Sequence, residues 1–143
     1  MTLAVMRTVP LWLAALWWGS LTTLGFFVVP MLFTHLPSPA MAGTMAGKLF
    51  SAQTAVSVVC GLLLLVFFRS NKTLDPVDIA QSATLFIVGG VLLALLVEFG
   101  VSPHIVARDN LALWHRVGTG MYMVQWICAA VVFGKLSMLR VYQ

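Results

Sequence analysis

The fold of this protein is decided by Ser82–Gly100, whose sequence is SATLFIVGGVLLALLVEFG. The stretch is apolar except for one ionisable side chain, Glu98, and it approaches the roughly 20 residues that a helix needs to cross a bilayer. Backbone groups inside lipid must hydrogen-bond within the segment, so a helix is predicted rather than a strand. A carboxylate in such a helix is costly, and it usually has a partner or a function.

The rest of the chain repeats this apolar pattern. The 143 residues are 61% hydrophobic and 8% charged, with a mean hydropathy of +1.01, so they cannot cover a soluble globule with polar groups. Four apolar stretches predict four membrane spans, at residues 9–33, 49–68, 79–101 and 111–133. We therefore expect an all-α membrane protein, with residues 1–143 forming a single domain. This domain is expected to be a four-transmembrane-helix bundle whose helices are joined by short loops, one of them at residues 70–77.

The basic residues predict the orientation of the bundle. If the N-terminus is cytoplasmic, five of the eight basic residues lie inside: Arg7, Arg69, Lys72, Lys135 and Arg140. The positive-inside rule then favours an N-in/C-in arrangement in the cell membrane, which in a bacterium is the inner membrane. The net charge of +4 indicates contact with anionic lipid headgroups of the bilayer. No concentrated basic patch is present, so no nucleic-acid partner is expected.

Small and polar residues at helical spacing predict which faces meet. Gly90, Ala94 and Glu98 lie in register, so Glu98 is expected on a packed face where another helix satisfies it, with Lys48, Arg116 or a histidine as its partner. The second span places small residues on one face: Ser51, Thr54, Ala55, Val58 and Gly61. The fourth span carries a polar stripe of His115, Thr119, Tyr122 and Gln125. Two interpretations of the stripe stay open: interhelical hydrogen bonds, or the wall of a polar cavity that Lys48 and Arg116 also line.

All three histidines are predicted at the same, outer membrane face as Glu98. Imidazole and carboxylate suit zinc, iron or copper(II), and thioether sulfur suits copper(I). Five of the eight methionines gather at this face: Met31, Met41, Met45, Met121 and Met123. The candidate ligands of a copper ion or haem b are thus His35, His115, Glu98 and, less strongly, His104, because Pro103 is expected to end the third helix. The alternative is a set of interfacial histidines that hydrogen-bond backbone carbonyls.

Three motifs carry a family resemblance: Gly25…Pro30-Met-Leu-Phe33-Thr-His-Leu36-Pro37, Ala46-Gly47-Lys48-Leu49-Phe50, and Trp114-His115…Tyr122…Gln125. With these motifs the whole chain resembles the transmembrane protein 205-like domains, small four-span membrane proteins of largely unknown function in bacteria. The resemblance implies that functional weight falls on His115 and on the Pro30–Pro37 turn. More distantly, the chain is similar to copper-resistance D-type and membrane protoporphyrinogen-oxidase-type bundles, which bind copper or haem through histidines.

Three classes of function stay open. The first is an accessory or binding protein with a His/Glu cluster at the outer face, assembled with partner subunits or as a homo-oligomer. The second is a copper- or haem-binding membrane protein that uses His35, His115 and Glu98. The third is a small transporter, or an enzyme that handles a hydrophobic substrate at the mouth of the bundle. A transporter would require an oligomer because one four-helix bundle encloses little room. An enzyme is the least favoured of these, since no serine or cysteine has an adjacent base and no Gly-rich phosphate loop occurs.

Overall fold

The computed structural model describes residues 3–70 and 77–141, which are helical apart from two short turns. Along the chain the elements are α1 (Leu3–Thr23), η1 (Leu24–Val28), α2 (Val29–His35), α3 (Pro39–Ser70), α4 (Val77–Leu96), η2 (Val97–Val101), α5 (Ser102–Val106) and α6 (Leu111–Val141). The elements η1 and η2 are single π-helical turns. The predicted loop at residues 70–77 lies almost wholly outside the described residues.

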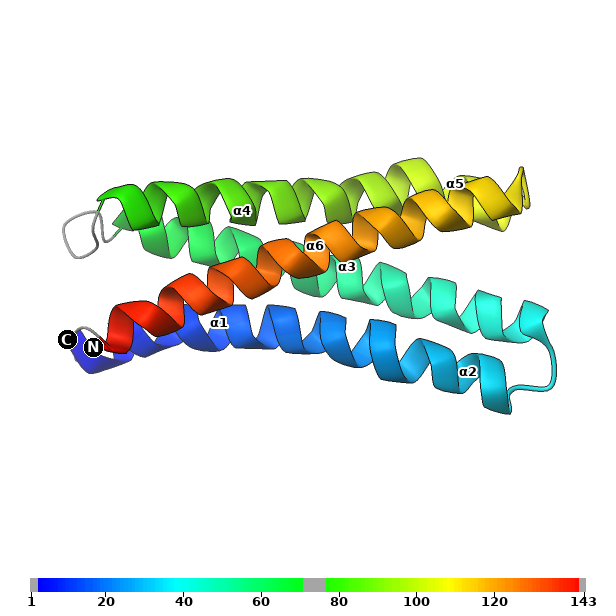
Figure 1. Ribbon diagram of the computed structural model, residues 1–143, viewed down its shortest axis with the longest axis horizontal. Coiled ribbons are helices and arrows are strands. Elements are labelled where there is room, and N and C mark those ends of the chain that lie inside the picture. The colour runs from blue at the N-terminus through cyan, green and yellow to red at the C-terminus, as the bar shows by residue number, and fades with distance from the viewer. Residues whose placement is uncertain (1–2, 71–76, 142–143) are drawn as a thin grey trace.

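These elements form four rods, each long and apolar enough to cross a membrane. In the described residues the spans are Thr8–His35, Pro39–Ser70, Gln81–Val106 and Leu111–Met138. Figure 1 shows both chain termini at one end of the bundle, which we call the terminal end. The α2–α3 and α5–α6 turns lie at the opposite end, which we call the loop end. The predicted all-α bundle of four transmembrane helices is confirmed, and the chain is a multi-pass membrane protein. That the loop end faces outward stays a prediction.

The four rods pack as a ring in the order α1, α3, α4, α6, so α1 lies diagonally opposite α4. The largest fully buried side chains of the described part fill the middle of this ring: Trp17, Leu21, Leu64, Ile87 and Val132. Gly90 of α4 makes room for the first of these. A Cβ at Gly90 would lie 2.8 Å from Cη2 of Trp17, so the indole fits only because this position has no side chain.

The helices extend further toward the loop end than the sequence predicts. The first span continues past residue 33 to His35, and α3 begins at Pro39 rather than at residue 49. Ser38 caps α3, because its Oγ accepts a hydrogen bond from the Met41 N–H at 3.2 Å. Proline is well suited to the first helical position that follows such a cap.

The expectation that Pro103 ends the third helix is wrong. Both Pro30 and Pro103 follow a π-helical turn and lie at the start of the next α-helix, α2 and α5 respectively. At that position the missing proline N–H costs little, because the first turn of a helix leaves its N–H groups without intrahelical partners. The rods therefore continue through both prolines, and both π-helical turns lie in the half of the bundle nearer the loop end.

Candidate functional site

The histidines at the loop end differ in their surroundings. His35 is held by its own helix, with Nδ1 3.0 Å from the Met31 carbonyl oxygen and 2.8 Å from Oγ1 of Thr34. This contact is of the kind that the alternative of carbonyl-bonded histidines predicts. His115 opens α6 and is exposed on the outside of the bundle. No hydrogen bond joins the side chains of His35 and His115.

His104 is fixed by a tight turn rather than released to solvent. Its ring stacks on Trp114 with centroids 4.0 Å apart and planes inclined by 3°. Its Nδ1 lies 3.4 Å from Oδ2 of Asp109, and the Asp109 N–H donates to the His104 carbonyl at 3.0 Å. The turn requires left-handed backbone at Arg108 (φ 55°) and Asn110 (φ 39°). His104 therefore belongs to the α5–α6 corner.

The described residues do not bring these positions together as a group of metal ligands. Within residues 3–70 and 77–141, no three His, Cys, Asp or Glu side chains are grouped closely enough to hold a metal ion. Three of the four candidate ligands also have separate partners: Glu98 accepts a hydrogen bond from α3, His35 contacts its own helix, and His104 contacts Asp109. The arrangement gives no support to a copper or haem b site.

Glu98 lies in η2, where the third span meets α3, and it is partly exposed; we call this place the α3–α4 seam. Its Oε1 accepts a hydrogen bond of 2.7 Å from the Ser51 hydroxyl. No basic side chain of the described residues forms an ion pair with it. The partner of Glu98 is therefore the neutral hydroxyl of Ser51, and not one of the expected partners Lys48, Arg116 or a histidine. One hydroxyl leaves most of the hydrogen-bonding capacity of a carboxylate unused, since two oxygens offer about four acceptor sites.

The depth of Glu98 makes this incomplete pairing costly. The third span has 26 residues, so it is about 39 Å long and exceeds the roughly 30 Å hydrocarbon core by about 9 Å. Glu98 lies about 12 Å along the helix from Val106, which places it about 7 Å inside the apolar layer if the excess is shared equally. A charged side chain at the centre of a span costs about 2.5–3.5 kcal/mol, and somewhat less nearer the interface.

A second group of polar side chains crosses the middle of the bundle, and its members hydrogen-bond to one another. The buried polar side chains of the described part are Gln53, Ser57 and Gln125. Gln125 Nε2 of α6 donates to Ser57 Oγ at 3.0 Å, and Gln53 Nε2 donates to Ser20 Oγ at 2.9 Å. We call Ser20, Gln53, Ser57 and Gln125 the central network. It joins α1, α3 and α6, including the diagonal pair α3 and α6.

The polar stripe of α6 divides between this interior and the outside. Gln125 belongs to the central network, and Tyr122 donates its hydroxyl to the Leu21 carbonyl at 2.7 Å. Thr119 is exposed and bonds only to the His115 carbonyl of its own helix. The buried face of α6 runs instead through Gly118 and Gln125, and Thr119 lies about 100° further round the helix than Gly118.

The sequence also assigns this polar stripe to the wall of a polar cavity. Lys48 and Arg116, the other two residues assigned to it, are exposed on the outside of the bundle. One hollow in the described residues is an apolar groove between the first span and α3. Its lining residues are Ala15, Leu16, Gly19, Ser20, Thr23, Leu24, Val28 and Leu49, and its volume is about 490 Å³.

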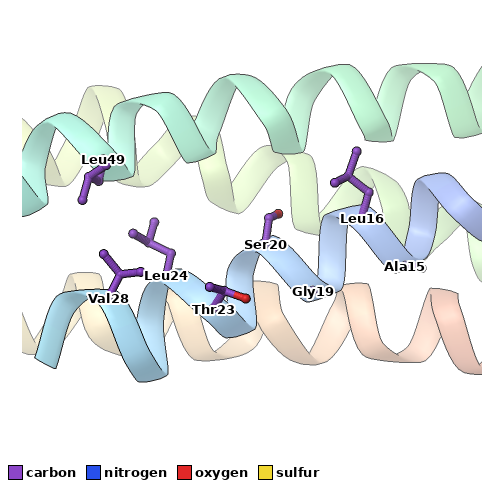
Figure 2. Close-up of a pocket in the computed structure, with 8 residues that line it drawn as sticks. All are labelled: Ala15, Leu16, Gly19, Ser20, Thr23, Leu24, Val28 and Leu49. Atoms are coloured by element: carbon purple, nitrogen blue, oxygen red, sulfur yellow. The ribbon is translucent and has the colours of Figure 1, made fainter. Parts of the chain in front are cut away.

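The groove is lined mainly by apolar side chains and has few polar groups that could bind a specific ligand. Figure 2 shows Leu16 and Ser20 pointing toward α3, and Leu24 and Val28 facing Leu49. The Ser20 hydroxyl is already used, because it donates to the Trp17 carbonyl and accepts from Gln53. A hydrocarbon chain fits such a lining, but nothing charged within it selects one ligand over another. Glu98 is therefore the more specific candidate site.

Comparison with known proteins gives a family for this chain. Residues 12–112 match the family described as "Domain of unknown function (DUF4149)". The chain belongs to this family. The DUF4149 match includes the first three spans and the start of the fourth, and so covers Glu98, Ser51 and Gln53. This match does not confirm the resemblance to the transmembrane protein 205-like domains. No curated protein and no solved structure matches the chain.

Sequence reasoning missed the partners of the polar groups. From the sequence, Ser51 is predicted only as a small packing residue, and Gln53 is not identified as functional. A signal was present, because Gln53 and Ser57 are polar residues one turn apart in an otherwise apolar helix, and such residues face the bundle interior. Nothing in the sequence specifies that Ser57 faces Gln125, since that contact depends on how three helices cross.

Proposed function

We propose that this member of the DUF4149 family is an accessory protein of the bacterial inner membrane, which acts by binding another membrane protein. The observation that supports this proposal is Glu98. It is a carboxylate within the apolar layer, partly exposed at the α3–α4 seam, with one neutral hydroxyl as its partner. A charge in that position is costly for an isolated chain, and membrane proteins retain such residues for partners or pathways.

The central network favours binding over transport. A transporter built from this bundle needs polar groups that line a pathway, whereas Ser57 and Gln125 bond to each other and Tyr122 bonds to the Leu21 carbonyl. These groups join helices within the chain. Glu98, by contrast, lies where a second protein can reach it. The same contrast supports a binding role over a catalytic one, because the polar groups of the central network are already used in hydrogen bonds.

The test is the composition of the protein as extracted from its native membrane. The tagged chain is taken from bacterial membranes into native nanodiscs with a styrene–maleic acid polymer, and the mass of each complex is measured. We expect the 15.6 kDa chain together with a second membrane protein in fixed stoichiometry. Particles that contain only the 15.6 kDa chain, alone or with copies of itself, would contradict the proposal.

A further inference from the structure

The surface beside Glu98 is flat along α3. Gly47, Ser51 and Ala55 follow one another at four-residue spacing, so they lie along one face of the helix. Ser51 and Ala55 are exposed, and a Cβ at Gly47 would meet nothing within 4 Å. We call Gly47, Ser51, Ala55 and Glu98 the Glu98 face. Small residues at this spacing allow a second transmembrane helix to approach closely.

Glu98 gives this face a preference for one kind of partner. Its carboxylate accepts one hydrogen bond, from Ser51, and has no ion pair within the described part of the chain. A cationic donor matches the remaining acceptor sites, because hydrogen bonds between ionised groups are stronger than neutral ones. In the apolar layer the attraction is also less screened than in water. The complementary group is an ammonium or guanidinium at the depth of Glu98.

A second copy of the chain is less suited to supply that group. In a dimer with its two-fold axis along the membrane normal, each residue of the second copy keeps its depth. Lys48, the nearest basic residue on α3, lies about one turn from Ser51 toward the loop end. It forms no ion pair with the Glu98 of its own chain. Arg108 lies further away still, beyond the end of α5.

These observations, together with the proposed role in partner binding on which this inference rests, identify the class of partner. We propose that the Glu98 face docks a transmembrane helix of another protein, and that this helix carries one lysine or arginine about 12 Å below its end at the loop side of the bundle. The small residues of α3 bring the two backbones together. Glu98 then receives the charge that this chain does not supply.

A designed peptide tests this inference without knowledge of the natural partner. The purified full chain, with a donor fluorophore at its N-terminus, is reconstituted in phosphatidylcholine vesicles. The acceptor-labelled probe is a Leu-Ala transmembrane peptide of about 20 residues with a single lysine at the depth of Glu98. Matched peptides carry leucine or glutamate at that position. Energy transfer as a function of peptide-to-lipid ratio gives the relative affinities.

We expect the lysine peptide to bind about tenfold or more tightly than the leucine peptide, and the glutamate peptide to bind no better than the leucine peptide. The preference for lysine should disappear in Glu98→Gln, which keeps an oxygen for the Ser51 hydrogen bond and therefore the fold. Ala55→Leu should weaken binding of the lysine peptide. Ala52→Leu, an exposed alanine on the adjacent face of the same helix, is the matched control and should not.

Equal binding of the lysine and leucine peptides, or a lysine preference that persists in Glu98→Gln, would overturn the inference. Self-association of donor- and acceptor-labelled chains that excludes the lysine peptide would overturn it as well, because the face would then belong to a second copy. If the peptides fail but native nanodiscs hold a second protein, partner binding stands and lies elsewhere. If the lysine peptide binds but nanodiscs hold only the chain, the proposed function fails and the charge preference of the face remains.

Discussion

The central network and the Glu98 face both place polar groups in the apolar layer. Only the polar groups of the central network are buried and hydrogen-bonded to one another. In the centre, Ser57 has a donor from α6, and Gln53 bonds to Ser20 of α1. At the α3–α4 seam, Glu98 is partly exposed and has one hydroxyl as its partner. The comparison indicates that polarity in the centre determines how this chain folds, whereas polarity at the seam is directed at something outside the chain.

The largest effect on the free energy of unfolding is expected in the bundle interior, where Gly90 packs directly against Trp17. Gly90→Leu places a side chain against Trp17, since even a Cβ there would lie 2.8 Å from the indole. Overpacking of a core costs about 1–3 kcal/mol, and we expect the free energy of unfolding in mixed micelles to fall by that amount. Gly89→Leu is the control, because a Cβ at Gly89 meets nothing within 4 Å. A comparable loss in Gly89→Leu would show that this description of the core is wrong.

A smaller effect on the free energy of unfolding is expected when a hydrogen bond of the central network is removed. Ser57→Ala removes the hydroxyl that accepts from Gln125 Nε2, and so leaves a buried amide short of a partner. Interhelical hydrogen bonds in membranes are worth about 0.6 kcal/mol on average and about 1.7 at most, so the free energy of unfolding should fall within that range. Thr119→Ala removes a hydroxyl bonded only within α6 and should change it less. Equal losses would mean that the network does not join helices.

The smallest effect on folding is expected at the Glu98 face. Glu98→Gln should leave the free energy of unfolding within about 0.5 kcal/mol of the wild type, and Glu98→Leu should leave it unchanged or raise it, because it removes the cost of a carboxylate in the apolar layer. The reason is that Glu98 has no charged partner in the described residues that its removal would leave unpaired. A loss of several kcal/mol in the same micelle assay would mean that Glu98 is a structural residue, and the contrast between the two regions would fail.

The sequence predicts the fold well because apolar length alone limits a membrane helix. All four spans are predicted, and the start of the last at Leu111 is correct. The errors arise where local chemistry overrides a rule. Pro103 does not end its helix because a π-helical turn precedes it, and α3 begins early because Ser38 caps it.

The polar site is predicted less well because its contacts depend on tertiary geometry. Glu98 is identified from the sequence as the unusual residue, and its place near α3 depends on which helices are neighbours. Its partner is a serine from the second span, 47 positions away along the chain. Hydropathy and helical spacing place residues on faces, but they do not specify the angle at which two faces cross. The grouping of His35 and His115 as candidate ligands rests on their place at one membrane face, and depth in the membrane does not determine direction around a helix.

The central claim, that the Glu98 face contacts another membrane protein, is tested most directly by photo-crosslinking in native membranes. A photoreactive amino acid is placed at Ala55 on this face, or at Val124, which is exposed on α6. We predict a crosslink from position 55 to one membrane protein, at a helix that carries a lysine or arginine, and its loss in Glu98→Gln. No such crosslink is expected from position 124. Crosslinking that is equal at the two positions, or that is unchanged in Glu98→Gln, would contradict the claim.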